Sequence, residues 1–395
     1  MELNALRAAL RGISACRELT AATVMSNAAA LLDALYQKKG EEALSVYTAL
    51  FYTLRQEGCE GLGDWLWDRL RYTETPYSRL IDQGKSDPAL ENAARRDVDT
   101  LVLLAETDCD RFIDAMKPLL PNEFAPVLAG LPRWRAAAPF NFDALTQFYR
   151  EHGSGLFSQY RAFLWEDGRL VPVADPDCPR PEDLLGYEHQ RHLVETNTRL
   201  MMAGRQANNV LLFGDGGTGK SATVKSMLYL PGLEDLRLIE VEKNNLTGMP
   251  NLIRSLEGRR QKFIDDLAFD QDDKTYSSMK TILEGTLEKR PVNVCICATS
   301  NRRHLVRQTF ADRAGDEVDT FETIAEKTAL AERFGLRIPY LTMNKSDYLA
   351  LVDHLAAQAG VDIPADRLHA QAMTWEIRHA GRTPRVARQF VASLS

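Results

Sequence analysis

This chain of 395 residues lacks the features that mark secreted, disulfide-bonded and membrane-spanning proteins. Its six cysteines include no C-x-x-C pair, so the sequence indicates neither a disulfide framework nor a zinc site and fits a reducing compartment. No uninterrupted apolar run approaches the roughly 18 residues that a membrane span needs. The first residues, Met1 to Arg7, do not show the charged-then-apolar order of a signal peptide. We therefore expect a cytoplasmic protein that does not enter a membrane.

A net positive charge, metal-binding patterns and nucleophilic triads are also missing. The formal net charge is −7, so a broad nucleic-acid-binding surface is not indicated, although arginines gather at Arg302-Arg303 and from Arg382 to Arg388. The seven histidines show no metal-ligand spacing, and no Ser-His-Asp or Cys-His arrangement is visible. The chemistry must therefore lie in another kind of motif, and binding to nucleic acid stays an open question.

A glycine-rich segment in the middle of the chain has the context of a phosphate-binding loop. The apolar run from Val210 to Phe213 predicts a short buried strand, and Ala222 to Tyr229 predicts a helix. The eight residues between them match the spacing G-x-x-x-x-G-K-[ST] at every fixed position. They are Gly214, Asp215, Gly216, Gly217, Thr218, Gly219, Lys220 and Ser221. We interpret this phosphate loop as a nucleotide site; the alternative is a glycine-rich turn that binds no ligand.

The residue types in this loop suit bound phosphate. Glycines let the backbone curl so that successive N–H groups face anionic oxygens, and the following helix adds the positive end of its dipole. Lys220 would reach the β- and γ-phosphates as a point charge, and Ser221 would offer a hydroxyl ligand to Mg²⁺. The sequence therefore predicts ATP and Mg²⁺ as cofactors.

Composition and periodicity divide the chain into four parts. Residues 1–158 show helical spacing and no catalytic constellation, which predicts an all-helical accessory domain that recognises a macromolecular partner. Residues 159–182 combine a candidate hairpin with closely spaced prolines, which predicts a linker. Residues 183–343 alternate apolar runs with helical segments, which predicts an α/β fold with a doubly wound parallel sheet. Residues 344–395 return to helical spacing, with three helix starts.

The order and content of these parts resemble the AAA+ ATPases, and most closely a bacterial family of uncharacterised function known only as ATP-binding proteins. The resemblance implies a P-loop NTPase sheet with a helical lid at 344–395, and a homo-oligomer. Gly186 and Tyr187 resemble the segment that closes over adenine. The segments that carry the resemblance are Leu184–Tyr187, Arg237–Val241, Ile264–Leu267, Ile282–Gly285, Ala298–His304 and Glu332–Gly335.

Asp265 and Asp266 resemble the acidic pair that ends the third strand of these ATPases. The resemblance places Asp265 at the metal and gives Asp266, which replaces the usual Glu, the task of orienting the attacking water. Only Phe263 and Ile264 precede the pair, where the family pattern has a longer apolar run. Since Arg259 to Lys262 do not suit a strand buried on both faces, we expect a very short strand or a sequence lacking about three apolar residues. The alternative for the pair is two surface aspartates before a loop.

Three further residues receive roles from the same resemblance. Asn301 matches the amide called sensor one, which holds the attacking water, or else caps a strand end. Arg385 matches sensor two, a lid cation that reaches the γ-phosphate, with Arg388 as the other candidate. Arg333 matches the arginine finger, whose planar fork pairs with phosphate oxygens in a neighbouring subunit's site. The alternative for these arginines is a solvent-facing side chain or a structural ion pair.

Together these features predict an AAA+ ATPase that remodels or loads a macromolecular partner. Water would attack the γ-phosphate of ATP, leaving ADP, while Lys220, Mg²⁺, Arg385 and a neighbour's Arg333 stabilise the developing charge. One alternative is a nucleotide-regulated binding module with little turnover, which Asp266 and the short strand favour. Another is a DNA-associated helper ATPase.

Overall fold

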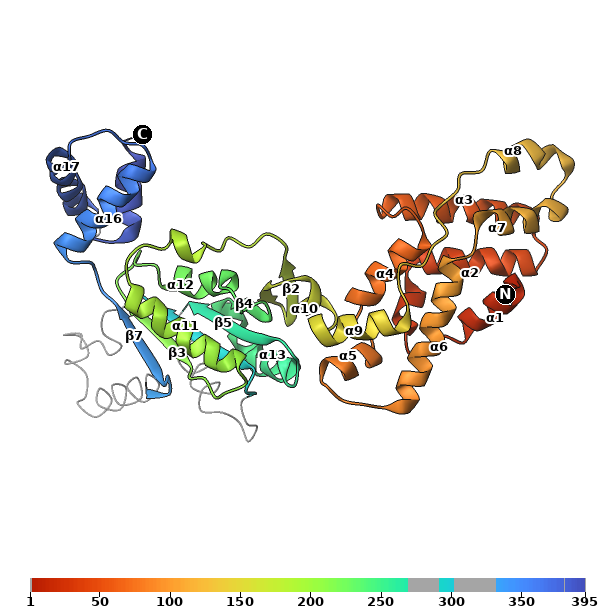
Figure 1. Ribbon diagram of the computed structural model, residues 1–395, viewed down its shortest axis with the longest axis horizontal. Helices are drawn as coiled ribbons and strands as arrows, with labels where there is room; N and C mark the ends of the chain where they lie inside the picture. Colours follow the sequence, from red (N-terminus) through yellow and green to blue (C-terminus); the bar gives the residue numbers. More distant parts are fainter. Residues whose placement is uncertain (1, 269–290, 302–331, 380, 395) are drawn as a thin grey trace. The chain divides into compact units, whose positions relative to one another are not determined.

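The computed structural model describes residues 2–268, 291–301, 332–379 and 381–394 (Figure 1). The chain divides into two units, Met1–Gln159 and Tyr160–Ser395. No helix within the described ranges is both long enough and apolar enough to span a bilayer.

The first unit is all-helical, as its apolar spacing predicts. In α3, for example, Tyr47, Leu50 and Leu54 recur at steps of three and four and are fully buried in one core. Trp65 belongs to the same core, and Trp67 packs at its edge on Phe140. The helices are α1 (Leu3–Arg11), α2 (Thr23–Tyr36), α3 (Gly40–Gln56), α4 (Leu62–Tyr72), α5 (Pro76–Asp82), α6 (Pro88–Ala105), α7 (Cys109–Met116), α8 (Ala125–Ala129), α9 (Phe142–His152) and α10 (Leu156–Gln159), with 3-10 helices η1 (Arg17–Ala21), η2 (Lys117–Leu119) and η3 (Asn122–Phe124).

The second unit is built on a seven-stranded sheet with the order β2-β1-β4-β5-β6-β3-β7. Every neighbouring pair is parallel except β1 and β2, which form the expected hairpin. This hairpin is part of the sheet, because β1 also pairs with β4. The strands are β1 (Ala162–Glu166), β2 (Arg169–Val173), β3 (Val210–Gly214), β4 (Leu236–Val241), β5 (Lys262–Ala268), β6 (Val294–Ser300) and β7 (Leu336–Tyr340).

Helices cover this sheet and form a separate lid after it. Alternate strand residues such as Val210 and Leu212 share a core with Val194 of α11 and Val224 of α12. The lid has its own core around Tyr348. The predicted α/β fold, a mainly parallel sheet followed by a helical lid, is thereby confirmed. The helices are α11 (Glu188–Met202), α12 (Lys220–Ser226), α13 (Met249–Leu256), α16 (Lys345–Gln358), α17 (Ala365–Arg378) and α18 (Pro384–Ala392), with 3-10 helices η4 (Pro181–Asp183), η5 (Met227–Tyr229) and η6 (Lys243–Gly248).

The expectation of a very short strand at the acidic pair is wrong. β5 has seven residues, against six in β4 and seven in β6. Arg259 and Arg260 lie before the strand, as their charge requires, but Lys262 is its first residue. The strand also continues for two residues beyond Asp266. Asp265 and Asp266 therefore lie inside the strand and not at its end. Residues 276–288, where the spacing of Met279, Ile282 and Leu283 predicts a helix, fall outside the described residues.

Candidate nucleotide site

The phosphate loop connects β3 to α12, as its sequence predicts. Gly214, Gly217 and Gly219 have φ angles of 134°, 78° and 93°, which favour glycine. At Gly214 an added Cβ would also overlap the backbone carbonyl of Tyr340 in β7. Glycine is therefore required here both for the turn and for close contact with the neighbouring strand.

Lys220 lies folded against the loop with only 5% of its surface exposed. Its Nζ donates hydrogen bonds to the carbonyl oxygens of Asp215, at 2.6 Å, and of Gly214, at 3.3 Å. Burial lowers the pKa of Lys220 to about 8, an effect that the Asp215 carboxylate opposes and the Arg385 cation reinforces. A phosphate at the loop would give this buried ammonium a further counter-charge beside the Asp215 carboxylate.

Ser221 meets a residue that the sequence analysis did not single out. Its Oγ lies 3.3 Å from Oγ1 of Thr299, near the end of β6. Thr299 follows the apolar run from Val294 to Ala298, and a hydroxyl at the carboxyl end of such a strand is the signal that could have identified it. The two hydroxyls mark the place where a metal ion would meet the loop.

The predicted metal ligand, Asp265, does not lie at the level of Ser221 in the sheet, because of the way β5 pairs with β6. Asp265 pairs with Ile296 of β6, whereas the β5 residue beside Thr299 is Ala268. Among the described residues no group of three or more His, Cys, Asp or Glu side chains could hold a metal ion. The described part of the site thus fits a nucleotide phosphate, and the hydroxyls of Ser221 and Thr299 are side chains there that a metal ion could meet.

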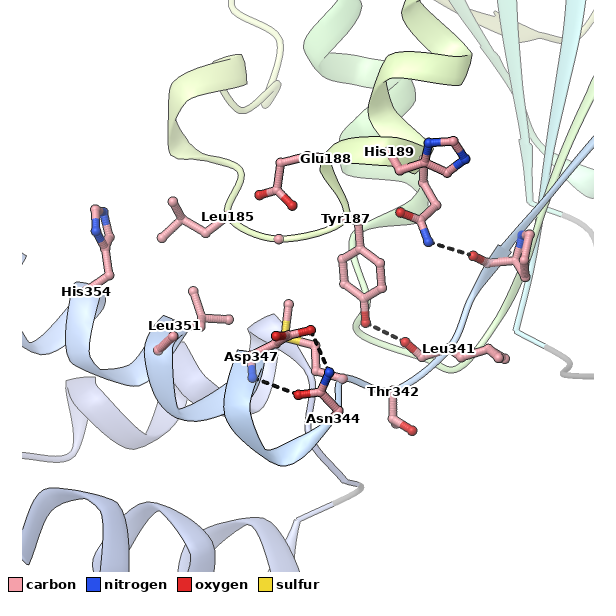
Figure 2. A pocket seen from close by; sticks show the side chains of 15 residues that line it. Leu185, Tyr187, Glu188, His189, Leu341, Thr342, Asn344, Asp347, Leu351 and His354 are labelled. Carbon is pink, nitrogen blue, oxygen red and sulfur yellow. Dashed lines mark hydrogen bonds between the residues drawn. The ribbon is translucent and has the colours of Figure 1, made fainter. Parts of the chain in front are cut away.

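Tyr187 joins the loop side of the site to the connection between β7 and the lid (Figure 2). Its hydroxyl donates to the carbonyl oxygen of Leu341 at 2.6 Å, and its ring stacks on Tyr340 with 5.0 Å between centroids. Gly186 and Tyr187 both have positive φ, which turns the chain into α11. The predicted adenine-closing segment is therefore held in place by the chain that leads to the lid.

The start of α18 lies directly against the phosphate loop. Thr383 caps this helix by accepting the N–H of Val386, and the N–H of Arg385 donates to the carbonyl oxygen of Gly217 at 3.3 Å. The Arg385 side chain is exposed at the cavity described next, while Arg388 donates to the carbonyl oxygen of Asp183 at 2.7 Å. Arg385 and Arg388, the two candidates for the sensor-two arginine, thus both lie on α18.

These elements enclose one cavity. Its volume is about 270 Å³, and it is lined by the loop from Gly217 to Gly219, by Tyr187, and by Arg385 and Arg388 of the lid. A larger cavity of about 800 Å³, shown in Figure 2, lies around Leu185, Asp347 and His354 and includes no loop residue. We assign the nucleotide to the smaller cavity because phosphate needs the loop.

The other predicted residues lie elsewhere. Asn301 directly follows β6 and is exposed. Arg333 is exposed in the turn before β7 and is absent from the described lining of the loop cavity. The structure therefore brings together the loop, Gly186, Tyr187 and Arg385, and leaves Arg333 outside the cavity of its own chain.

The lowered pKa of Lys220 predicts proton uptake when ATP binds in alkaline solution. Above pH 8 the free amine is largely neutral, and a bound triphosphate favours the ammonium, so binding takes up a proton and weakens as the pH rises. Titration calorimetry at about pH 9, in buffers with different ionisation enthalpies, should show this uptake. No buffer dependence at that pH would contradict it.

The lowered pKa of Lys220 also determines how the free energy of unfolding changes with pH. Lysine has a pKa of 10.5 when unperturbed, so between pH 8 and 10.5 the unfolded chain binds more protons than the folded chain. This group therefore makes the free energy of unfolding rise with pH across that window.

One sequence family and several solved structures are similar to part of this chain. The sequence profile of a family described as "Protein of unknown function (DUF815)" matches residues 158–395, which include the whole second unit. No match was found among curated proteins. The solved structure of the Thermotoga maritima RuvB Holliday junction branch migration motor is similar, with 13% identity, a TM-score of 0.35 and coverage of 54% of this chain and 63% of that chain.

A mutant of the same motor gives 14% identity, a TM-score of 0.35 and coverage of 54% and 65%. The match thus spans less than two thirds of these motors' own length. At such scores the likeness is distant, and the fold assignment depends on the sheet order and the loop of this chain.

Proposed function

This chain belongs to the DUF815 family, and we propose that it binds ATP between the phosphate loop and the lid and lets the bound nucleotide set the lid position. One observation supports this above all: the loop, Tyr187 and the start of α18 line a single cavity. These segments are far apart in the sequence, so the fold has gathered a phosphate site, an aromatic wall and a cationic helix end at one place.

Each part has a separate task in this proposal. The loop N–H groups and Lys220 would hold the phosphates, Tyr187 would pack near the base, and Arg385 would reach the γ-phosphate. Mg²⁺ held by the Ser221 hydroxyl would supply charge neutralisation when bound. The AAA+ pattern adds Asp265 as a ligand, but the pairing of β5 with β6 does not place its backbone beside Ser221. The helical first unit would contact the macromolecular partner, which is a protein or a nucleic acid.

Two versions of this function differ in turnover. In the first, ATP is hydrolysed to remodel or load the partner, with Asp266 orienting the attacking water, Asn301 holding it and Arg333 acting in a neighbouring copy. In the second, the chain holds ATP with little turnover and its nucleotide state is the signal. The pairing of Asp265 with Ile296, away from Thr299, favours the second version.

Asp215 is the residue that would transmit nucleotide binding to the lid. Its carboxylate Oδ2 accepts the N–H of Thr342 at 2.7 Å, and its own N–H donates to the carbonyl oxygen of Tyr340 at 2.9 Å. The carbonyl oxygen of Asp215 accepts from Lys220. When Lys220 turns toward a phosphate it must leave this oxygen, and the change occurs at the residue that holds the connection to the lid.

Hydrogen exchange measured with and without ATP tests the function. In the parent protein ATP should change the protection of the backbone amides at 341–344. Asp215→Ala should bind ATP within about tenfold of the parent yet lose most of this change, since one hydrogen bond to the connection is removed. Asp215→Asn should keep it, because the amide oxygen can accept the same hydrogen bond.

Two results would count against the proposal. If ATP binds without any change at 341–344 in the parent, the nucleotide does not control the lid. If Asp215→Ala responds to ATP as fully as Asp215→Asn does, the connection through Asp215 is wrong while ATP binding itself stands.

A further inference from the structure

The pairing of β5 with β6 shows how far the acidic pair lies from the phosphate loop. Thr299 marks the level of the loop, because its hydroxyl is 3.3 Å from that of Ser221. The β5 residue at this level is Ala268, and Asp265 precedes it by three residues. At about 3.3 Å per residue, the backbone of Asp265 is about 10 Å short of the loop and that of Asp266 about 7 Å short.

The pairing on the other side of β6 gives the same result. β3 pairs with β6 so that Leu212 lies beside Thr299 and Phe213 beside Ser300. The loop begins at Gly214, one residue further along. Measured from the backbone alone, Asp265 therefore lies well before the edge of the sheet where the phosphates would bind.

The start of β5 is fixed, so the strand cannot slide to correct this offset. Buried Asn293 donates from Nδ2 to the carbonyl oxygens of Leu256, Arg259 and Gln261, at 2.8, 3.2 and 3.3 Å, and accepts the N–H of Phe263 at 2.8 Å. On the other side, the N–H of Lys262 donates to the carbonyl oxygen of Asp235. These bonds fix the register of β5 against both neighbouring strands.

We infer that a three-residue register offset in β5 holds the hydrolytic half of this nucleotide site dormant. The inference rests on the proposed binding of ATP. A carboxylate that orients water must lie within hydrogen-bond reach of that water, and an aspartate has only one methylene between its backbone and its carboxylate. Asp266 is the residue with this task, and its backbone offset of about 7 Å is longer than such a side chain can span. The chain then responds to nucleotide occupancy and not to a hydrolytic cycle.

Inserting three apolar residues, Leu-Val-Leu, between Ile264 and Asp265 should restore the missing alignment. Because the start of β5 is fixed, the insertion moves Asp265 to the level of Thr299. We expect steady-state ATP hydrolysis to rise by about 100-fold or more, the lower end of what a positioned general base contributes. ATP affinity should stay within a few-fold of the parent, because the loop is unchanged.

Asp266→Asn supplies the matched control in both backgrounds. In the extended chain it should remove the gain, and in the parent a loss of tenfold or more in turnover would show that Asp266 already acts on the water. The parent measurement needs no insertion, so it tests the inference even if the extended chain does not fold. Thermal unfolding of each variant shows whether its fold is intact.

The outcomes separate this inference from the proposed function. A parent that fails to bind ATP in calorimetry would end both. A parent that binds ATP and loses tenfold or more of its turnover with Asp266→Asn would overturn the dormant site alone. A folded, ATP-binding extended chain with no faster hydrolysis would overturn it equally.

Discussion

Lys220→Ala should lower the affinity for ATP by about 10- to 150-fold. The ammonium would make charge-assisted hydrogen bonds to phosphate, and losing one such contribution costs about 1.5–3 kcal/mol. The fold should survive, since the variant removes a buried cation that donates to two loop carbonyls, those of Gly214 and Asp215. Titration calorimetry with ATP gives the affinity, and thermal unfolding checks the fold.

Lys225→Ala is the control for this experiment. Lys225 lies on the same helix, α12, and pairs with Glu240 at 2.9 Å, away from the loop. Losing this half-exposed ion pair should cost about 0–1 kcal/mol of folding free energy and leave ATP affinity nearly unchanged. If both variants weaken ATP binding equally, or if Lys220→Ala binds as the parent does, the phosphate-loop assignment is wrong.

The parts of the fold that sequence predicted well depend on short-range rules. The predicted strand at Val210–Phe213 is present as β3, because a continuous apolar run suits a parallel strand covered on both faces. α18 begins at Pro384 after the cap Thr383, as the Thr-Pro pair indicates. The loop motif likewise includes its own turn, since its glycines adopt the angles that the turn needs.

The parts that sequence could not predict depend on contacts between distant segments. The length and register of β5 follow from Asn293, which lies about 30 residues further along and fixes the start of the strand. The sequence shows that two apolar residues precede Asp265. It does not show that the strand continues through Leu267 and Ala268, because that follows from their pairing with the neighbouring strands.

The contact between Asp215 and the connection to the lid could not be predicted from the sequence for a similar reason. In G-x-x-x-x-G-K-[ST] its position is free, so the motif says nothing about its side chain. Its carboxylate meets the N–H of Thr342, 127 residues later in the chain. Because Gly214 must also contact the carbonyl of Tyr340, only the folded sheet shows that this end of the loop is attached to the connection with the lid.

Arg333→Ala should bind ATP nearly as the parent does and lose ATP-dependent self-association. Arg333 is exposed, while its neighbour Phe334 is buried and Gly335 packs closely on Asn208. The turn is thus fixed on one side, with the arginine at the surface and outside the described lining of its own loop cavity. If Arg333 contacts a nucleotide phosphate, it does so in another copy of the chain.

The size of the effect follows from the contact that is lost. A bidentate arginine–phosphate pair contributes about 1.5–3 kcal/mol, so association in the presence of a non-hydrolysable ATP analogue should weaken by about 10- to 150-fold. Sedimentation velocity measures this directly, with ADP as the reference state. Arg337→Ala is the matched control, because Arg337 is an exposed arginine on β7 only four residues away.

Mixing two variants tests whether the finger acts between chains. Lys220→Ala subunits keep an intact Arg333 but hold little ATP, and Arg333→Ala subunits hold ATP but lack the finger. In a mixed pair, Arg333 of the Lys220→Ala chain can contact the ATP that the Arg333→Ala chain binds.

The opposite contact has neither the arginine nor a bound ATP. Assembly should therefore stop at dimers of one chain of each kind. Sedimentation should therefore show dimers in the mixture and monomers of each variant alone. Monomers in the mixture, despite full folding and ATP binding by the Arg333→Ala partner, would exclude a finger that acts in trans.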